Sequence, residues 1–314
     1  PFPPMIHAGP HDADQREQLL YDLELRFPPL SRTVSAISAL LSNKSEAPST
    51  ERLIEIVKMD PVVVSSVLRR INSAYYGLQR HFDDISKAIV MIGFLEVSNI
   101  VLTSGYIGIR KSITSKAQSA VLENMIRASV GTGFYMRLIA SRIQVQYTAT
   151  AYTTGLLHSV GRLMLLYNNP DVYVELWRSN TQGFAPPAEM ERKYLGIDHA
   201  RLGAIAATHW RLPSPISELI ESYLNPGHIE DVALRNLALS LKVSVGVSEQ
   251  LCAYREGLVR AGETTDLIKP DFAFTYIPEV AVLAQACGME AKDLELLIAS
   301  NQQDAFQYIE SMTQ

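Results

Sequence analysis

The stretch MDPVVVSSVLRRINSAYYG, from Met59 to Gly77, is the most constraining feature of this sequence. Asp60 can cap the N-terminus of a helix, and Pro61 suits the first helical position because its φ is already helical and its missing N–H needs no partner there. Gly77 can end the helix, since glycine tolerates the left-handed conformation that commonly follows a C-terminus. Start and stop signals this close together predict a short helix between short loops.

Similar helix-capping and helix-terminating residues recur along the chain and predict an all-α protein. Val34, Ile37 and Leu41 are spaced to share one helical face, Ser49 or Thr50 can cap the helix that follows them, and a further short helix (ISKAIVMIG) should close at a glycine. Alternating stretches such as VYVEL and KVSVGVS lie inside longer helical periods. We therefore expect no β-strands.

Several longer segments are also predicted to be helical. Residues 12–27, 147–167 and 231–257 each carry a helical pattern over their whole length, and the last of these should form about seven turns. Residues beyond 257 should form two or three more helices, with one of them spanning 292–312. The polar stretch 111–119 is the best candidate for a boundary between domains.

Composition narrows the class of protein. The chain has 314 residues, of which 47% are hydrophobic and 19% are charged, as is usual for soluble globular proteins. The net charge is −5, and lysines and arginines are scattered rather than clustered, so nucleic-acid binding is disfavoured although a small basic face could form in three dimensions. Cys252 and Cys287 form no framework of paired spacings, which favours a reducing compartment and a cytoplasmic location.

No segment has the length and hydropathy expected of a membrane span or a secretory signal. The longest apolar run, AIVMIGFLEVSNIVL, is interrupted by Glu96 and Asn99, and the first residues lack a basic and an apolar region. We therefore expect no membrane association.

From about Leu25 to Pro226, the order and spacing of the predicted helices and of their start and stop residues resemble an HDOD domain. The motifs that carry the resemblance are the Asp60-Pro61 helix start, the Asn72-Ser73-Ala74 triplet, GLLHSVGR, and HWRLP with its preceding Glu191, Gly196 and His199. The resemblance implies an all-α fold related to HD-type metal-dependent phosphohydrolases, and a role in bacterial signalling beside cyclase, phosphodiesterase, receiver or kinase modules. It also implies that many members have lost the metal site.

The metal-ligand positions of the catalytic relatives are only partly retained in this chain. The first histidine of those relatives falls on Ala128, the His-Asp pair falls on His158 and Ser159, and a later histidine falls on His199. A hydrolytic metal centre needs several fixed nitrogen or oxygen ligands. Ala128 offers no donor side chain and Ser159 offers no charge, so we expect no metal, no cofactor and no catalytic residue.

The remaining ligand positions are also replaced. The His-His pair of the two-metal relatives falls near Tyr223-Leu224, and the final aspartate falls among Lys242, Val243 and Ser244. The sequence predicts that His158 is a packed core histidine and that His199 has a capping and packing role. Asn72 is either a structural cap or a contact for a ligand or partner.

Three functions are compatible with these residues. The first is a non-catalytic HDOD signal-transduction module that acts through contacts with proteins or a ligand, with a link to cyclic dinucleotides as one version. The second is an HD-type phosphohydrolase acting on a nucleotide or cyclic dinucleotide, which the missing ligands oppose. The third is a nucleic-acid-binding regulator. The sequence leaves the oligomeric state open.

We divide the chain into four parts. Residues 1–24 form an N-terminal extension with a helix, residues 25–112 the N-terminal helical subdomain, residues 113–257 the HD-like subdomain, and residues 258–314 a C-terminal helical tail. The sequence does not decide whether the tail packs on the core or mediates assembly.

Overall fold

A computed structural model describes residues 32–42, 49–77, 82–108, 115–180, 184–210, 212, 214–265, 268 and 272–313. These residues form helices and connecting segments without any strand, which confirms the all-α prediction. The extension 1–24 and the helix expected over 12–27 lie outside the described residues, as do residues 111–114 of the expected boundary.

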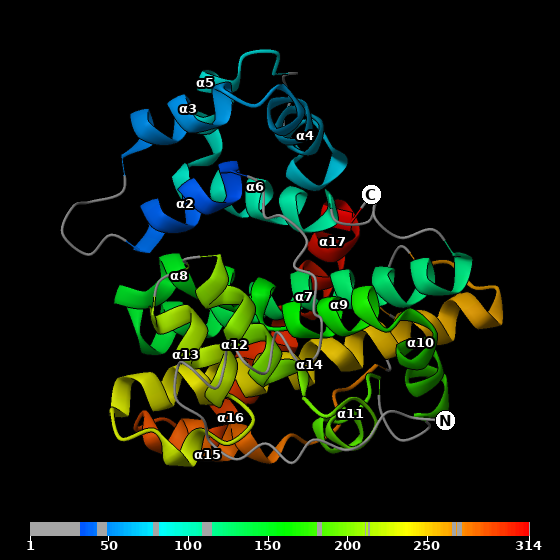
Figure 1. The fold of residues 1–314 in the computed structure, drawn as a ribbon. Helices are drawn as coiled ribbons and strands as arrows, with labels where there is room; N and C mark the ends of the chain where they lie inside the picture. The colour runs from blue at the N-terminus through cyan, green and yellow to red at the C-terminus, as the bar shows by residue number, and fades with distance from the viewer. Residues whose placement is uncertain are drawn as a thin grey trace.

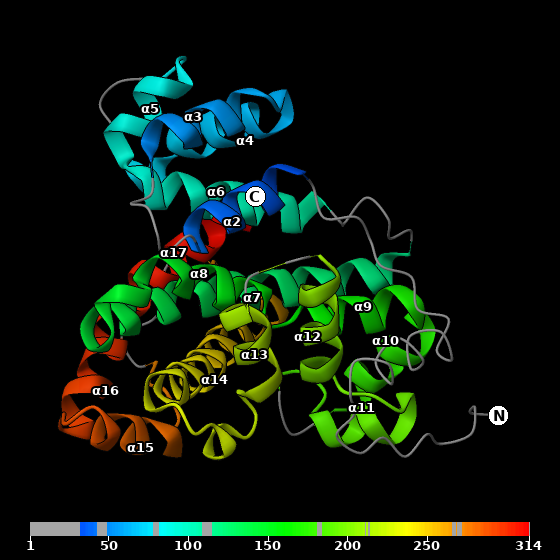
Figure 2. The ribbon, with the colours of Figure 1, turned by 60° about the vertical axis from the view of Figure 1, so that its left-hand side comes forward.

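The helices nearest the N-terminus form one layer of the molecule, which lies above the larger bundle in both ribbon views (Figures 1 and 2). Its helices are α2 (Arg32–Ser42), α3 (Thr50–Lys58), α4 (Pro61–Ile71), the 3-10 helix η1 (Ala74–Tyr76), α5 (Ile85–Ile92) and α6 (Phe94–Gly108). The side chain of Asp60 accepts hydrogen bonds from the amides of Val62 and Val63, and that of Ser49 accepts one from Arg52, so both predicted caps are present.

The end of α4 differs from the prediction. The helix ends at Ile71 with Asn72 as its cap, and Gly77, with φ of +55°, follows η1 instead of α4. The glycine has the left-handed conformation that we expected, but it ends a different element. Gly93, with φ of +90°, closes α5 as predicted.

The larger bundle is built on two long helices that cross at its centre. Its helices are α7 (Lys116–Ile143), η3 (Val145–Tyr147), α8 (Thr148–Leu157), α9 (Val160–Asn168), α10 (Pro170–Ser179), α11 (Ala188–Leu195), α12 (His199–His209), α13 (Ser214–Ser222), η4 (Pro226–His228) and α14 (Val232–Ala261). The long helix α14 confirms the prediction for residues 231–257, with Asp231 as its N-cap and Gly262, at φ of +69°, just past its end.

The predicted single helix over 147–167 is wrong, because the chain breaks at His158 and Ser159 between α8 and α9. The ring Nδ1 of His158 lies 2.6 Å from the carbonyl oxygen of Gly155. A side chain that binds this carbonyl competes with the backbone amide that would continue the helix. The histidine therefore stands at a helix end, where the hydrophobic pattern of the sequence gives no sign of a break.

The described residues of the tail form three helices after α14, and these pack back on the core. They are α15 (Pro278–Ala286), α16 (Ala291–Ser300) and α17 (Gln302–Thr313), so the expected helix over 292–312 is divided at Asn301. Phe306, Tyr308, Ile309 and Met312 of α17 are buried. Their burial shows that the last helix is part of the folded core.

Helix α17 joins the two layers, and Figures 1 and 2 both show it running from the bundle up to α6. The ring of Tyr308 contacts Tyr75 of the upper layer and Phe134 of α7, with centroids 5.5 and 5.4 Å apart. The guanidinium of Arg70 donates to the carbonyl of Ser311. One continuous hydrophobic cluster accordingly extends from α2 through the bundle to α17.

None of the described helices by itself has both the length and the hydropathy of a membrane span. The helices Ile85–Ile92 and Phe94–Ser104 reach the length and hydropathy of a membrane span only when they are counted together, across a bend of 117° between them.

Candidate functional site

The crossing of α9 and α12 brings His158 and His199 into one buried centre. Gly161 makes this approach possible, because a Cβ atom at that position would lie 1.9 Å from the carbonyl oxygen of His199. The same Cβ would lie 2.7 Å from the amide nitrogen of Gly203, on the other side of the crossing. Two glycines thus let the backbone of α9 touch that of α12.

His158 is buried at the α8–α9 break, with 2% of its surface exposed. Because a carbonyl oxygen can only accept, Nδ1 of His158 donates to Gly155. Burial is the main reason why the pKa of His158 is lowered to about 3; the bond to Gly155 opposes this shift, and the nearby Arg162 and His199 add to it. The imidazole is therefore neutral near pH 7, and its edge packs on the ring of Tyr223.

His199, the first residue of α12, is held on both ring nitrogens. Its Nδ1 and its backbone amide lie 2.5 and 2.8 Å from the same carboxylate oxygen of Glu191, and its Nε2 lies 2.5 Å from the hydroxyl of Tyr223. The hydroxyl of Tyr173 donates to the other oxygen of Glu191 at 2.7 Å. Burial alone would raise the pKa of Glu191, but His199 and Arg162 lower it below its usual value. The carboxylate is therefore ionised and holds His199 in place.

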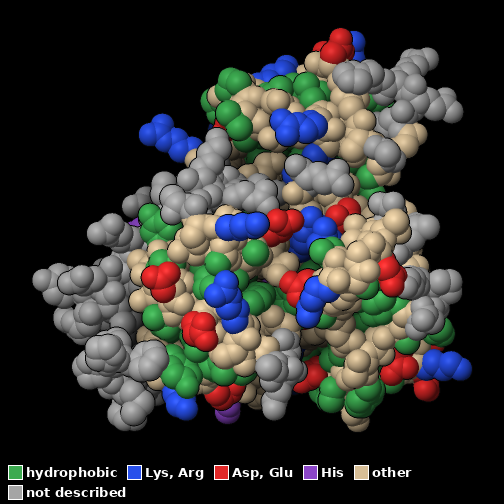
Figure 3. Space-filling view, turned by 90° about the vertical axis from the view of Figure 1, so that its right-hand side faces the viewer, with side chains coloured by type: hydrophobic (Ala, Val, Ile, Leu, Met, Phe, Trp, Pro, Cys, Tyr) green, Lys and Arg blue, Asp and Glu red, His purple; other side chains and the backbone are tan. Residues whose placement is uncertain are grey.

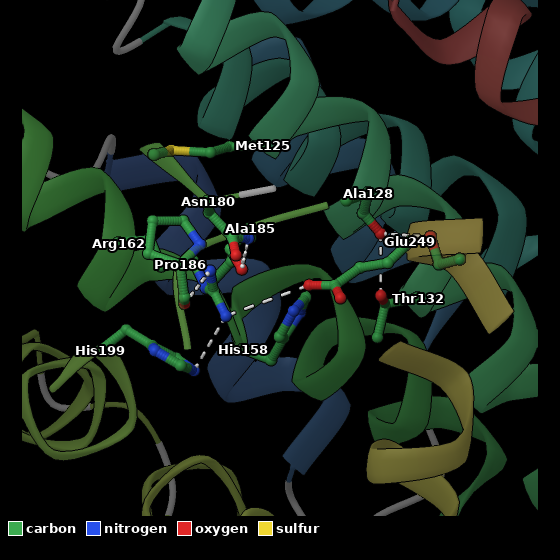
Figure 4. Close-up of polar contacts among 12 residues, drawn as sticks. Met125, Ala128, Thr132, His158, Arg162, Asn180, Ala185, Pro186, His199 and Glu249 are labelled. Carbon is green, nitrogen blue, oxygen red and sulfur yellow. Dashed lines mark hydrogen bonds and ion pairs between the residues drawn. The ribbon is translucent and has the colours of Figure 1, made fainter. Parts of the chain in front are cut away.

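Ser159 follows His158 directly and contacts Ser129, the residue after Ala128. The hydroxyl of Ser159 is 2.5 Å from that of Ser129, which lies 2.7 Å from the carbonyl of Met125. The Ala128 carbonyl accepts from Thr132 at 2.8 Å and from Ser248 at 2.7 Å (Figure 4). The two histidines are joined through the ring of Tyr223, while Ala128 is linked to Ser159 only through its neighbour Ser129.

The expected closing positions on α14 do not face this centre. Lys242 donates to the carbonyl of Leu224 at 3.1 Å and pairs with Glu279 of the tail at 3.1 Å, while the Ser244 hydroxyl donates within its own helix. The acidic residue of α14 that reaches the centre is Glu249, which lies 4.0 Å from the guanidinium of Arg162. Glu249 lies five to seven residues further along the helix than the positions where we expected an aspartate.

Arg162 is a charged residue of this centre that the sequence analysis missed. It follows His158 by four residues, and its guanidinium lies between His199 and Glu249 (Figure 4). Its place at the end of the GLLHSVGR motif was a usable signal. Tyr173 and Glu249 carried no such signal, because their places depend on how α10 and α14 pack.

Asn72 lies away from this centre, in the upper layer. Its amide nitrogen donates to the carbonyls of Leu68 and Phe82, and its amide oxygen accepts from the Phe82 amide, each at 2.8 Å. Asn72 also lines an open groove with Pro61 and Ile85. The three backbone bonds favour the structural alternative for Asn72, while the ligand contact stays a prediction.

The residues present do not fit the metal centre that the resemblance implies. Nowhere in the described part of the chain do three His, Cys, Asp or Glu side chains converge so as to hold a metal ion. His158 and His199 supply imidazole nitrogens, but Ser159 is neutral, and Nε2 of His199 already meets Tyr223 and, at 3.5 Å, Arg162. A metal ion bound at Nε2 of His199 would be repelled by the positive charge of Arg162.

A family model described as the HDOD domain matches residues 27–226. An uncharacterized protein from Treponema pallidum (strain Nichols) is 24% identical over 196 residues, which are 60% of this chain and 37% of that protein, so this chain matches well under half the length of its curated relative.

Three solved structures share the fold. An HDOD domain protein of unknown function from Geobacter sulfurreducens is 18% identical, with a TM-score of 0.69 and 96% and 98% of the two chains covered. A candidate signal transduction protein from Marinobacter aquaeolei VT8 is also 18% identical, with a TM-score of 0.68 and 96% and 66% covered. A candidate phosphohydrolase from Shewanella amazonensis SB2B is 20% identical, with a TM-score of 0.63 and 94% and 97% covered. At these identities the likeness extends to the fold alone.

Proposed function

Because this chain belongs to the HDOD domain family, we propose that it is a non-catalytic regulatory module of bacterial signal transduction, which acts by binding another protein or a ligand. The fold neighbour named as a candidate signal transduction protein agrees with this role, and a link to cyclic dinucleotides is one version of it. The proposal includes a cytoplasmic location, which the two free thiols of Cys252 and Cys287 support.

One observation carries the proposal: the ring nitrogens of His199, Nδ1 of His158 and the hydroxyl of Ser159 already bind groups of the protein itself. Both nitrogens of His199 have partners, Nδ1 of His158 binds a backbone carbonyl, and Ser159 binds Ser129. Hydrolysis by a metal centre needs ligands that leave an open position for water. A centre that is closed by its own side chains is suited to holding helices together.

The alternative is a metal-dependent phosphohydrolase, since one fold neighbour is named as a candidate for that activity. Elemental analysis of protein expressed with added iron and manganese separates the two functions, when it is combined with assays on bis(p-nitrophenyl) phosphate and a cyclic dinucleotide. We expect far less than one metal ion per chain and no metal-dependent turnover. One or two bound ions per chain, together with turnover, would establish the hydrolase instead.

Nucleic-acid binding is the third candidate, and the surface charge disfavours it. On the face shown in Figure 3, basic and acidic side chains are interspersed rather than separated into a basic stripe. Such a stripe supplies the phosphate contacts that make DNA binding salt-dependent. We expect no mobility shift with duplex DNA at 0.1 M salt.

Exposed apolar side chains in the upper layer give the partner experiment a starting point. Met59 and Val62 flank the start of α4, and Val90 and Met91 lie near the end of α5; each is at least 60% exposed. Exposed apolar side chains that gather on one part of a protein often mark a contact surface. We expect a cyclase, phosphodiesterase, receiver or kinase to co-purify from the native organism.

The matched variants are Val90→Asp in the upper layer and Leu296→Asp in the tail, since both side chains are more than half exposed. The first should weaken capture of the partner about tenfold, and the second should leave it unchanged. If both variants capture the partner equally well, the partner does not bind at the exposed apolar side chains of the upper layer. Failure to capture any signalling protein would count against the role as a whole.

A further inference from the structure

A cleft of about 750 Å³ opens between the start of α7, the end of α10 and the C-terminal end of α14. Trp177 and Phe184 line it with aromatic rings, whose centroids lie 5.5 Å apart and whose planes stand at 78° to one another. Both residues are only half-buried, so ring surface is left for a ligand. The volume is that of a site for a small organic molecule.

Arginines from α10 and α14 line the same cleft. Arg178 of α10 is exposed and forms no ion pair with any residue that the structure describes. On α14, Arg260 pairs with Glu256 at 3.3 Å, and Nε of Arg255 lies 2.7 Å from Glu310. Because a guanidinium carries five N–H donors, these two arginines keep donors for a ligand beside the ones that they use.

The acidic side chains of the lining, Glu123 and Glu256, already have basic or amide partners. Glu123 lies 3.1 Å from the guanidinium of Arg127, and Glu256 accepts from the amide of Asn124 in addition to its pair with an arginine. When Glu310 is included, three glutamates share this group with four arginines. The cleft therefore carries a net positive charge, which favours an anionic ligand.

The loop that carries Phe184 is held in place from two sides. The side chain of Asn180 donates to the carbonyl of Ala185 at 2.8 Å, and Arg162 of the buried centre donates to the carbonyl of Pro186 at 3.0 Å (Figure 4). The aromatic wall is thus fixed by bonds within the protein itself. A preformed wall lowers the free-energy cost of ordering when a ligand binds.

We propose that this cleft binds a nucleotide, with the base against Trp177 and Phe184 and the phosphate against Arg178. Aromatic side chains give stacking surfaces to bases of every kind, and guanidinium groups bind phosphate oxygens through paired N–H donors. Asn124 and Glu256 add hydrogen-bonding groups for the polar edge of the base. The inference rests on the proposed regulatory function, for which it names the ligand.

The fluorescence of Trp177 reports on the cleft directly. The chain contains two tryptophans, so Trp210→Phe leaves Trp177 as the only indole. We titrate this variant with the four common ribonucleoside monophosphates and with cyclic di-GMP in about 0.1 M salt. At least one of them should change the fluorescence with a dissociation constant below about 1 mM. Isothermal titration of the wild type repeats the measurement without the substitution.

Two fragments of the ligand test its class. Inorganic phosphate lacks the ring and the matching nucleoside lacks the phosphate, so each should bind at least about tenfold more weakly than the nucleotide. No binding of any nucleotide in both titrations overturns the inference. It is also overturned if either fragment binds as tightly as the nucleotide.

Arg178→Gln and Trp177→Leu should each weaken nucleotide binding at least about fivefold. The matched control is Arg142→Gln, which removes an exposed arginine at the opposite end of α7 and should bind as the wild type does. Arg178 is exposed, so its variant keeps the test valid if Trp177→Leu does not fold. Equal binding by Arg178→Gln and Arg142→Gln would contradict the assignment.

Chromatography of the nucleotide after incubation with the wild type separates this inference from the proposed function. Binding with recovery of intact nucleotide supports both. Hydrolysis of the nucleotide that binds would refute the non-catalytic function and keep the cleft as a binding site. Capture of a signalling protein without any nucleotide binding would refute the cleft alone.

Discussion

Replacing Glu191 with glutamine tests the central claim that a buried carboxylate organises the α9–α11–α12 junction. The change keeps the size of the side chain but removes the charge. Glu191 is fully buried and accepts from the His199 amide at 2.8 Å, from the His199 ring at 2.5 Å and from Tyr173 at 2.7 Å, with Arg162 4.0 Å away. Glutamine has one acceptor oxygen, so its NH₂ group must face a donor or an arginine.

Breaking a buried ion pair at one end costs about 3–5 kcal/mol, and the free energy of unfolding of Glu191→Gln should fall by that amount at pH 7. Urea unfolding followed by circular dichroism measures the loss. The control is Glu189→Gln on the same helix, whose side chain is 80% exposed and pairs with Arg192, and which should change stability by less than about 0.5 kcal/mol.

The pH dependence of the difference gives a second readout. The pKa of Glu191 is lower in the folded protein than its usual value, so its contribution is fully present above about pH 4.3 and is lost as pH falls through the folded pKa. The gap between wild type and Glu191→Gln should therefore be constant from pH 7 to 5 and narrow below pH 4. A gap that is no larger than that of Glu189→Gln, or that does not change on acidification, would refute the reasoning.

Three further substitutions test the neighbouring residues. His158→Ala should lower the free energy of unfolding by about 1–3 kcal/mol at pH 7 without removing any hydrolytic activity. Because burial lowers the pKa of His158 to about 3, this loss of stability should shrink as pH falls from about 6.5 toward 3. A variant as stable as the wild type at pH 7 would contradict this prediction. Ser159→Asp alone should give no metal-dependent turnover in a phosphodiesterase assay, because Arg162 still occupies the centre. Gly161→Ala should cost about 3 kcal/mol in urea unfolding, since its Cβ would meet the His199 carbonyl, whereas Gly227→Ala, with no atom within 4 Å of its Cβ, should be nearly neutral.

The helices could be predicted from the sequence wherever a cap or a stop residue is local. Asp60, Ser49, Gly93 and Asp231 each act through backbone groups within a few residues, so their roles follow from the sequence alone. The break at His158 could not be predicted in this way. It depends on a ring that binds a carbonyl three residues earlier while the surrounding side chains keep a continuous hydrophobic pattern.

Only part of the candidate site could be named from the sequence. The family resemblance pointed to Ala128, His158, Ser159 and His199; in the structure Tyr223 contacts both histidine rings, and Ser159 contacts the serine next to Ala128. The partners that fix the centre come from elsewhere: Arg162 is near in sequence, but Glu249 meets it only because α14 crosses the bundle. Contacts between distant helices depend on packing geometry, which local residue patterns do not encode.

The place of α17 has a consequence for biosynthesis. The residues of α2–α6 are translated well before α17, yet Tyr75 and Arg70 contact Tyr308 and Ser311, which follow more than 200 residues later. At 5–20 residues per second, the interval between α6 and α17 is about 10–40 s. For that time the nascent upper layer presents uncovered apolar surface to chaperones and to other polysomes.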